Sequence, residues 1–381
     1  MLMNTYLKPQ IVFEKGDGCY VISKSGDKYL DFSSGIGVNC LGYSHPAILE
    51  AITEGSSLMH LSNLYDTEQD RILADKLVKR TGLDSVFFAN SGAEANEGAI
   101  KLARKYSFDH YGAGRDEIIT LKNSFHGRTI TTLSATGQDK FHKFYMPFTA
   151  GFSYAEPNHL ADLLSLITEK TCAVLIELVQ GEGGVLPLEK DYVTQLSNLC
   201  QERDILLIVD EVQTGIGRCG QFFVSEEYNI LPDIVTFAKG LGGGMPIGAI
   251  VAGKNCKNTF GLSDHGSTFG GNPLACRISN AVLDKLDRDF LTSVRENGNY
   301  LKEKIARLNN QYIKEVRGLA LMLGIELTGA SASDVRNMCL EKQLLVLTAG
   351  NNTIRLLPPL IVNKAQIDQC IDILNEVLLS I

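Results

Sequence analysis

Long apolar runs, paired cysteines and a recognisable targeting segment are all missing from this chain, and each absence excludes a class of protein. A membrane-spanning helix needs about 20 mostly apolar residues, and no run approaches that length, so no transmembrane segment is expected. The nine cysteines are an odd number and form no CxxC pair, which predicts reduced thiols rather than a disulfide framework. The first residues show neither an apolar core nor an Arg-rich amphipathic pattern, so we expect a cytoplasmic protein without a targeting peptide.

Positive charge is also in short supply. The chain has 36 Lys and Arg against 44 Asp and Glu, a net charge of −8, which argues against a nucleic-acid or anionic-membrane surface. It has no HExxH and no Cys/His cluster, so a metal hydrolase and a metal cofactor are not expected. It has no GxSxG, which argues against a serine hydrolase. With 381 residues, 44% of them hydrophobic, it can form two or three domains, or one large α/β domain with appendages.

Short apolar runs alternate with helical periodicity through the middle of the chain, beginning near His45. The runs are SVFFAN, EIITLK, AVLIELV, ILLIVD, DIVTFA and IGAIVAG. Such alternation predicts a mostly parallel sheet flanked by helices, an α/β fold. Before it, residues 10–32 alternate around two glycine turns and predict a small antiparallel meander.

The pattern changes again after Asn272-Pro273. We expect a long helical stretch over residues 274–309, then further strands, a helix near 332–343 and a last amphipathic helix over 364–379. That is a smaller α+β unit. The chain is therefore expected to divide into an N-terminal segment, 1–44, that packs with a small domain, 274–381, and a large domain, 45–273. The active site is expected in the cleft between the lobes.

Asp210 and Lys239 each close an apolar strand-like run. In open α/β sheets, ligands bind outside the carboxyl ends of the strands, so these two side chains are expected to lie close together. Pyridoxal 5'-phosphate (PLP) requires such a pair: a lysine that forms a Schiff base with its aldehyde, and a carboxylate that pairs with its protonated pyridine nitrogen. Either residue alone is as well explained as a surface lysine or an N-capping aspartate. The pair, followed by a Gly-rich loop, favours the cofactor.

A predicted strand ends at Asn90, and Ser91, Gly92 and Ala93 lead directly into a helix. The free N–H groups and the positive dipole end of a helix N-terminus make an anion site. Gly92 lets the main chain approach a phosphate closely. The alternative is an ordinary serine N-cap with Glu94 in the first turn.

Three more segments fit an anionic aromatic cofactor and an acidic substrate. Phe125 could stack on a pyridine ring, and Arg128 could hold a substrate carboxylate through two hydrogen bonds. Glu177 and Glu182 lie on either side of a predicted strand end, where two acids near an anionic cofactor need partners, one of them a mobile arginine. Thr268 could donate to a phosphate. Each also has an ordinary explanation: a core phenylalanine, a surface arginine, a solvated loop, a plain turn.

Taken together, from GIGVNCLGYSHP to IRLLPPL, these motifs resemble those of the class III, fold-type I PLP-dependent aminotransferases. Within that family the chain is most similar to the N-acetylornithine aminotransferases of arginine biosynthesis. The resemblance implies that Lys239 and Asp210 are catalytic, that Gln213 lies near the cofactor's ring hydroxyl, and that a homodimer places Thr268 in the partner's site. The residues it assigns to the cofactor are Ser91, Gly92, Ala93, Phe125, Glu177, Asp210, Gln213, Lys239 and Thr268.

The family accepts two unlike substrates in one pocket, a terminal amine donor and the 2-oxoglutarate/glutamate pair. The resemblance implies that Glu182 neutralises Arg355 during the first half-reaction and releases it to bind the α-carboxylate of glutamate in the second. Arg128 would hold the distal carboxylate in both. Ser267 completes the expected substrate-binding set.

The choice within the family depends on a few positions. Ornithine aminotransferases resemble the chain closely but typically carry Tyr where Gly35 stands and Trp where His126 stands, and this chain has no Trp at all. Gly35 leaves room for an acyl group on the donor nitrogen. Leu178 stands where the family has proline, which puts the position of the Glu182 loop in doubt. Ornithine, N-succinylornithine, N-succinyl-diaminopimelate and 4-aminobutyrate stay open as donors.

Two other classes fit less well. Gly215, Gly217 and Gly220 satisfy GxGxxG, but the motif begins several residues past the strand and no opening helix follows it, so a dinucleotide site is not expected. A non-catalytic binding protein that kept the fold would not need both Lys239 and Asp210.

Overall fold

Seven strands form the largest sheet of the structure, a computed structural model that describes residues 2–6 and 8–381. Their order is β4-β12-β11-β10-β7-β5-β6. Their bounds are β4 Ser85–Ala89, β5 Glu117–Leu121, β6 Phe152–Ala155, β7 Thr171–Ile176, β10 Leu206–Asp210, β11 Ile234–Phe237 and β12 Gly248–Ala252. Only β12 runs against its neighbours within this sheet, which confirms the predicted mostly parallel α/β architecture. The apolar runs missed β6, because this edge strand is only partly buried.

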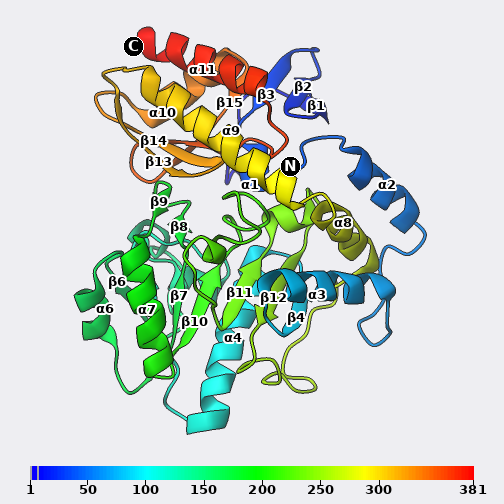
Figure 1. Cartoon of the computed structure of the whole chain (residues 1–381), viewed down its shortest axis with the longest axis vertical. Helices are drawn as coiled ribbons and strands as arrows, with labels where there is room; N and C mark the ends of the chain where they lie inside the picture. The colour runs from blue at the N-terminus through cyan, green and yellow to red at the C-terminus, as the bar shows by residue number, and fades with distance from the viewer. Residues whose placement is uncertain (1, 7) are drawn as a thin grey trace.

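Helices cover both faces of this sheet. Leu206 and Ile208 point to the face covered by α4, Gly92–Tyr111, whereas Leu207 and Val209 point to the face of α6, Leu160–Leu166, and α7, Lys190–Glu202. Successive strand residues face opposite sides, so a strand covered on both sides must be apolar throughout, and all of β10 is buried. The helices α3 Glu68–Thr81, α5 Ile130–Ala135 and α8 Pro273–Leu283 also lie beside the sheet, and α2 Pro46–Gly55 packs on α8 (Figure 1).

A second sheet, β13-β14-β17-β16, is antiparallel and carries the C-terminal helices (Figure 1, yellow to red). Its elements are β13 Ile313–Leu319, β14 Met322–Leu327, β16 Leu347–Ala349 and β17 Thr353–Leu356, with α9 Arg288–Arg307, α10 Ala332–Glu341 and α11 Lys364–Leu379. The long helical stretch expected over residues 274–309 is helical but interrupted. It is two helices, because the chain leaves α8 after Leu283 and the Asp287 side chain accepts from Phe290 N at 2.8 Å and caps α9.

The predicted N-terminal meander is confirmed. It consists of β1 Phe13–Asp17, β2 Tyr20–Ser23 and β3 Lys28–Asp31, and β3 pairs in parallel with β15, Leu344–Leu345. This pairing ties the N-terminal segment to the C-terminal unit. An apolar cluster continues from α3 beside the large sheet to α11 at the C-terminal end. The domain boundaries at residues 44 and 273 stay a prediction.

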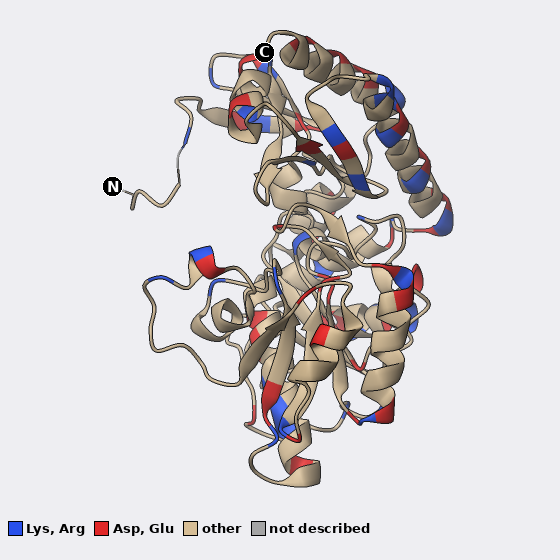
Figure 2. Cartoon of the chain, turned by 90° about the vertical axis from the view of Figure 1, so that its left-hand side faces the viewer, with Lys and Arg blue, Asp and Glu red and all other residues tan. Residues whose placement is uncertain are grey.

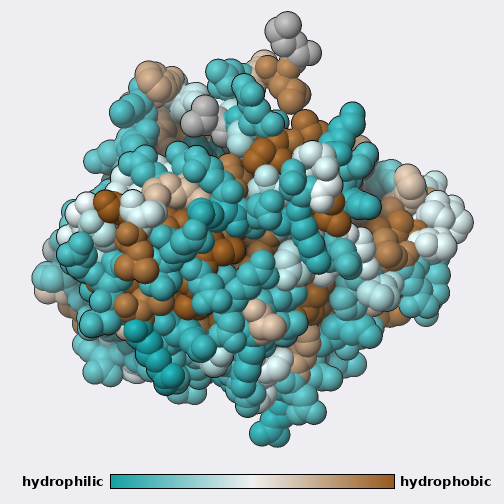
Figure 3. Space-filling model, turned by 90° about the horizontal axis from the view of Figure 1, so that it is seen from above, coloured by the Kyte–Doolittle hydropathy of each residue, from teal (hydrophilic) through white to brown (hydrophobic). Residues whose placement is uncertain are grey.

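Lys and Arg are interspersed with Asp and Glu along the ribbon, both in the C-terminal helices and around the large sheet (Figure 2). From the end that carries the C-terminal helices, hydrophilic side chains predominate and apolar ones show between them (Figure 3). All nine cysteines are buried and unpaired, which confirms the expectation of free thiols. Among residues 2–6 and 8–381, no helix is both long and apolar enough to cross a membrane.

Candidate active site

The carboxyl ends of five strands meet at one edge of the large sheet and deliver the predicted residues there. Ser91 follows β4, Phe125 follows β5 and Glu177 follows β7 directly, while Asp210 ends β10 and Lys239 follows β11. The register pairs Asp210 with Thr236, three residues before Lys239. The five strand-end residues named first line one cavity of about 420 Å³, together with Gly92, Ala93, Arg128 and Gln213. The sequence argument that placed Asp210 and Lys239 together is therefore confirmed geometrically.

The N-terminus of α4 faces the cavity. The Ser91 side chain accepts from Glu94 N at 3.2 Å and caps the helix. Gly92 leaves no room for a side chain, because a Cβ there would lie 2.6 Å from a Val212 methyl group. Because the Ser91 side chain takes the Glu94 N–H, the Gly92 and Ala93 N–H groups are left for a ligand on a closely packed wall, which is what a phosphate site needs.

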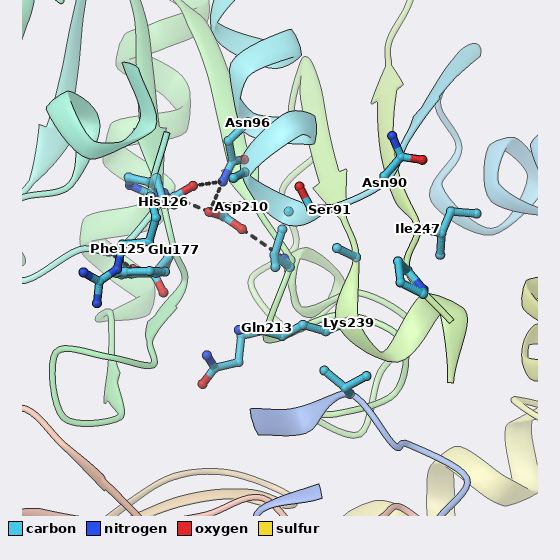
Figure 4. Close-up of a pocket in the computed structure, with 18 of the residues that line it drawn as sticks. Asn90, Ser91, Asn96, Phe125, His126, Glu177, Asp210, Gln213, Lys239 and Ile247 are labelled. Carbon is cyan, nitrogen blue, oxygen red and sulfur yellow. Dashed lines mark hydrogen bonds and ion pairs between the residues drawn. The ribbon is translucent and has the colours of Figure 1, made fainter. Parts of the chain in front are cut away.

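Asp210 is held by three donors. Its Oδ2 accepts from Asn96 Nδ2 at 2.7 Å and from His126 Nδ1 at 2.8 Å, and its Oδ1 accepts from Val212 N at 3.0 Å (Figure 4). Asn96 in turn donates to the His126 carbonyl at 2.8 Å and accepts from Thr236 Oγ1 at 2.7 Å. The carboxylate is therefore fixed by α4, by the loop after β5 and by the backbone that follows β10, while Thr236 on β11 holds Asn96 in place.

Sequence reasoning missed part of this network. Asn96 and Thr236 were passed over, and His126 was used only as a marker within the family. One signal was available: Asn96 lies in the buried stripe of α4 and is 1% exposed, and a buried polar group requires partners. Which partners it has depends on the sheet order, which the sequence alone does not give.

Lys239 sits on a strained turn at the base of the cavity. Its φ is +43°, a left-handed conformation that costs a non-glycine residue about 1 kcal/mol and is typical of functional sites. Burial lowers the pKa of Lys239 to about 8; Glu182 opposes that shift and Arg355 adds to it. A larger share of this amine than of an ordinary lysine is therefore neutral and able to act as a nucleophile or base.

Glu177 is satisfied by the backbone. It accepts from Phe125 N at 2.8 Å and from Gly181 N at 3.2 Å. Burial raises the pKa of Glu177 to about 7; His126 lowers it and Asp210 raises it further. The expectation that each acid at this edge needs partners is confirmed for Glu177, since the two N–H groups fix its position.

Glu182 and Arg355 form an ion pair at 2.6 Å, and Arg355 Nη1 also donates to Gln213 Oε1 at 3.1 Å. Burial by itself would raise the pKa of Glu182, but the Arg355 guanidinium outweighs it and holds that pKa below its ordinary value. Arg355 is 2% exposed. The reading of the Glu182 segment as a plain solvated loop is wrong, because its carboxylate pairs with a buried arginine.

The doubt raised by Leu178 is also resolved. Leu178 is fully buried in the apolar cluster under the sheet, and its carbonyl accepts from Leu188 N at 2.9 Å and Tyr228 Oη at 3.2 Å. The backbone at Leu178 is therefore held by these bonds without a proline, and Glu182 still reaches Arg355.

Arg128 lies exposed at the cavity with its guanidinium over aromatic rings. Its Cζ is 4.1 Å from the Phe141 ring centre and 5.5 Å from that of Phe125. Stacking of this kind fixes the plane of the guanidinium and leaves its N–H edge available for a carboxylate.

Five residues predicted to act in the site do not line this cavity of their own chain: Gly35, Glu182, Ser267, Thr268 and Arg355. The Glu182–Arg355 pair contacts a lining residue, because Arg355 donates to Gln213. Thr268 is exposed. Ser267 is turned to Asn90, whose Nδ2 donates to Ser267 Oγ at 3.1 Å. Gly35 does not line the cavity, whereas Val38, three residues later, does. The GxGxxG segment, residues 215–220, forms turns and opens no helix, as expected.

A model of the aminotransferase class-III family matches residues 2–378. The chain belongs to the class-III aminotransferases. This class-III aminotransferase is 50% identical over 380 residues to the acetylornithine aminotransferase of Haemophilus ducreyi, an overlap that covers 99% of this chain and 96% of that one. It is 48% identical over 384 residues to that of Caldanaerobacter subterraneus subsp. tengcongensis, covering 100% and 98%.

Solved structures agree on the fold. The N-acetylornithine aminotransferase of Stenotrophomonas maltophilia K279a superimposes on this class-III aminotransferase with a TM-score of 0.87 at 33% identity, covering 98% of this chain and 96% of that one. The ornithine aminotransferase of Toxoplasma gondii, whose active site holds PLP at partial occupancy, gives a TM-score of 0.95 at 28% identity, covering 100% and 92%. The fold is therefore PLP fold type I.

The residues present fit PLP. The α4 N-terminus at Gly92 offers N–H groups to a phosphate, and the Phe125 ring offers a face to an aromatic ring. Asp210, 4% exposed and held by its three donors, offers a fixed negative charge to a protonated ring nitrogen. Lys239 offers a partly neutral amine to an aldehyde. The family implies PLP, and the residue assignments stay predictions.

Proposed function

We propose that this chain is an acetylornithine aminotransferase. It transfers the terminal amine of N-acetyl-L-ornithine to 2-oxoglutarate and gives N-acetylglutamate 5-semialdehyde and glutamate, a step of arginine biosynthesis. The observation that carries the proposal is the Glu182–Arg355 ion pair at 2.6 Å, beside a lysine of lowered pKa and a fixed aspartate. Relatives of 48–50% identity over the whole chain, named acetylornithine aminotransferases, support the choice of donor.

The cofactor proposed for the site is PLP, which supplies an electron-accepting ring when bound. Asp210, whose orientation is fixed by Asn96 and His126, would keep the ring nitrogen of the bound cofactor protonated. Lys239 Nζ would take the proton from the substrate carbon that bears the amine and would deliver it to the cofactor carbon bonded to the same nitrogen. A lysine pKa of about 8 suits this exchange, because both protonation states are populated near neutral pH.

The two arginines sort the substrates. Arg128 holds a carboxylate at the mouth of the cavity in both half-reactions. While Glu182 is paired with Arg355, the charge of Arg355 is neutralised, which suits a terminal amine on an apolar chain. When a substrate with an α-carboxylate enters, that carboxylate replaces Glu182 on Arg355.

A homodimer completes the site. Thr268 is exposed and lies away from its own cavity, which supports its contribution to the phosphate site of the partner subunit. Large exposed apolar residues of the kind that an interface covers are Leu58, Met59, Leu64, Tyr65, Phe144, Tyr145, Met146 and Phe269. The nine free thiols support a cytoplasmic enzyme.

The test is a half-reaction on purified, PLP-loaded protein. N-Acetylornithine, ornithine and 4-aminobutyrate are added separately without an oxoacid, and the loss of the cofactor's visible absorption is followed by stopped flow. Rapid loss with N-acetylornithine and slow loss with the others is expected. Equal or faster loss with ornithine would reject the choice of donor and favour an ornithine aminotransferase. If no amine changes the absorption, or if PLP does not bind, the enzyme proposal fails.

A further inference from the structure

The loop that carries Glu182 is docked on the same sheet that carries Arg355. This loop joins β8, Val179–Gln180, to β9, Leu186–Pro187. The Gly350 N–H donates to the Glu182 carbonyl at 2.9 Å. Two residues further on, Arg317 Nε donates to the Gly184 carbonyl at 3.0 Å. The backbone at Glu182 and two residues after it is therefore bonded to the C-terminal sheet and to the turn between β16 and β17.

Arg317 and Arg355 belong to one cross-strand row of that sheet. Arg317 on β13 pairs with Gly324 on β14, and Gly324 pairs with Arg355 on β17. Directly paired residues project from the same face, so the two arginines flank a position that has no side chain. The loop fills that gap: a Cβ on Gly324 would lie 2.9 Å from Val185 Cβ and 3.1 Å from the Gly184 carbonyl oxygen.

Arg317 also reaches the strand of Arg355 directly. Its Nη2 donates to Thr353 Oγ1 at 3.1 Å, and Thr353 is 2% exposed. Its Nη1 pairs with Glu315 at 2.9 Å and with Glu326. The guanidinium is 12% exposed, and bonds to a partly buried charged group are stronger than neutral ones. One side chain thus connects the Glu182 loop, β14 and β17.

The docked loop is under strain. Val185 has a φ of +56°, a conformation that a β-branched residue avoids, and Gly184 has a φ of +124°. Such strain persists only where the surroundings fix the backbone. Removal of the Arg317 bond to Gly184 would let the loop relax away from the sheet and draw the Glu182 carboxylate away from Arg355.

We propose that Arg317 is a positioning residue that docks the Glu182 loop beside Arg355 and thereby sets how readily Glu182 yields Arg355 to a substrate α-carboxylate. The proposal rests on the proposed function for its substrates. It assigns a specificity role to a residue that does not line the cavity and whose contacts all lie on the C-terminal sheet or on the loop itself.

The test compares Arg317→Met and Arg317→Lys with Lys314→Met on PLP-loaded protein. Lys314 is a matched control, because it lies on the same strand, pairs with the same Glu326 and is exposed. Two quantities are measured: the dissociation constant of glutarate, an unreactive dicarboxylate, by calorimetry, and the ratio of half-reaction rate constants for glutamate and N-acetylornithine. In Arg317→Met we expect tighter glutarate binding and a ratio shifted toward glutamate by about tenfold. Arg317→Lys is expected to recover part of the shift, and Lys314→Met to leave both quantities unchanged.

A double-mutant cycle with Glu182→Ala separates positioning from general stability. If Arg317 acts through Glu182, Arg317→Met changes neither quantity further in the Glu182→Ala background. An equal loss in both half-reactions, or a full additional shift in that background, would overturn the proposal. Thr353→Val removes the Arg317–Thr353 bond with little change of shape. It is expected to shift the ratio of rate constants in the same direction by a smaller factor. A folded Thr353→Val protein without any shift would also count against the proposal. If the wild-type protein fails to react with N-acetylornithine, the proposed function fails, and the glutarate measurements still decide the role of Arg317.

Discussion

The lowered pKa of Lys239 predicts how the cofactor-free protein captures PLP as the pH changes. Burial moves the pKa of this amine from its ordinary 10.5 to about 8. Only the neutral amine attacks an aldehyde, so the capture rate is expected to follow the neutral fraction. At pH 7 that fraction is about one tenth, roughly 300-fold above that of an unshifted lysine.

The charges around Lys239 predict how variants move the pH midpoint of PLP capture, the pH at which half of this amine is neutral. Glu182 raises the pKa of Lys239 and Arg355 lowers it. Glu182→Gln is therefore expected to move the midpoint below about 8, and Arg355→Gln to move it above. The two variants together determine the sign of each contribution, because both substitutions remove a charge and keep much of the side chain.

The assay mixes apo-protein with PLP over about pH 6 to pH 10 and follows the cofactor absorption by stopped flow. The rate should rise about tenfold per pH unit below the midpoint and level off above it. N-α-Acetyl-lysine is measured in parallel as a control for the ionisations of PLP itself. A midpoint near that of the free amine, or a rate independent of pH, would refute the reasoning.

The same pKa shift makes the free energy of unfolding of the cofactor-free protein depend on pH. The folded amine is the weaker base, so between about pH 8 and pH 10.5 the unfolded chain binds more protons, and stability should rise with pH through that window. The slope is expected to disappear in Lys239→Met, which denaturant titrations at several pH values would measure.

Four further outcomes are expected. Glu182→Ala should weaken discrimination between N-acetylornithine and glutamate in the half-reactions; unchanged discrimination would rule out the two-arginine switch. Asn96→Ala removes a 2.7 Å bond to the ring-pairing carboxylate and should lower kcat by about tenfold, whereas an effect on KM alone would contradict its role. Gly92→Ala should weaken PLP binding measured by equilibrium dialysis, because the added Cβ disturbs the phosphate wall. Mixed subunits of Lys239→Ala and Thr268→Val should regain one working site per dimer; no recovery on mixing would show that the threonine serves its own subunit.

Local pattern predicted most of the strands and several helix ends. The run ILLIVD was predicted as a buried strand, and β10 is buried along its whole length. The last helix was predicted over 364–379, and α11 has these bounds. Its start is fixed by a capping box between Asn363 and Gln366. The break between α8 and α9 was missed, because both sides keep the helical period and only the Asp287 cap divides them.

The site divides in a similar way. Asp210, Lys239 and the α4 N-terminus were predicted because the carboxyl ends of parallel strands must meet at one edge. The partners of Asp210 were not, since Asn96 and His126 approach it from elements far away in the chain. The Arg317 bond to Gly184 joins residues 133 positions apart, so no local sequence pattern predicts it.

By itself the sequence determined the order of strands and helices along the chain, the family, and the residue types at the strand ends, because these depend on local periodicity and on short motifs. The tertiary structure alone decided which strands are neighbours, how Asp210 is oriented, and that the Glu182 loop rests on the sheet of Arg355. These depend on pairings between distant segments, whose free energy comes from burial and from hydrogen bonds that exist only once the whole chain has folded.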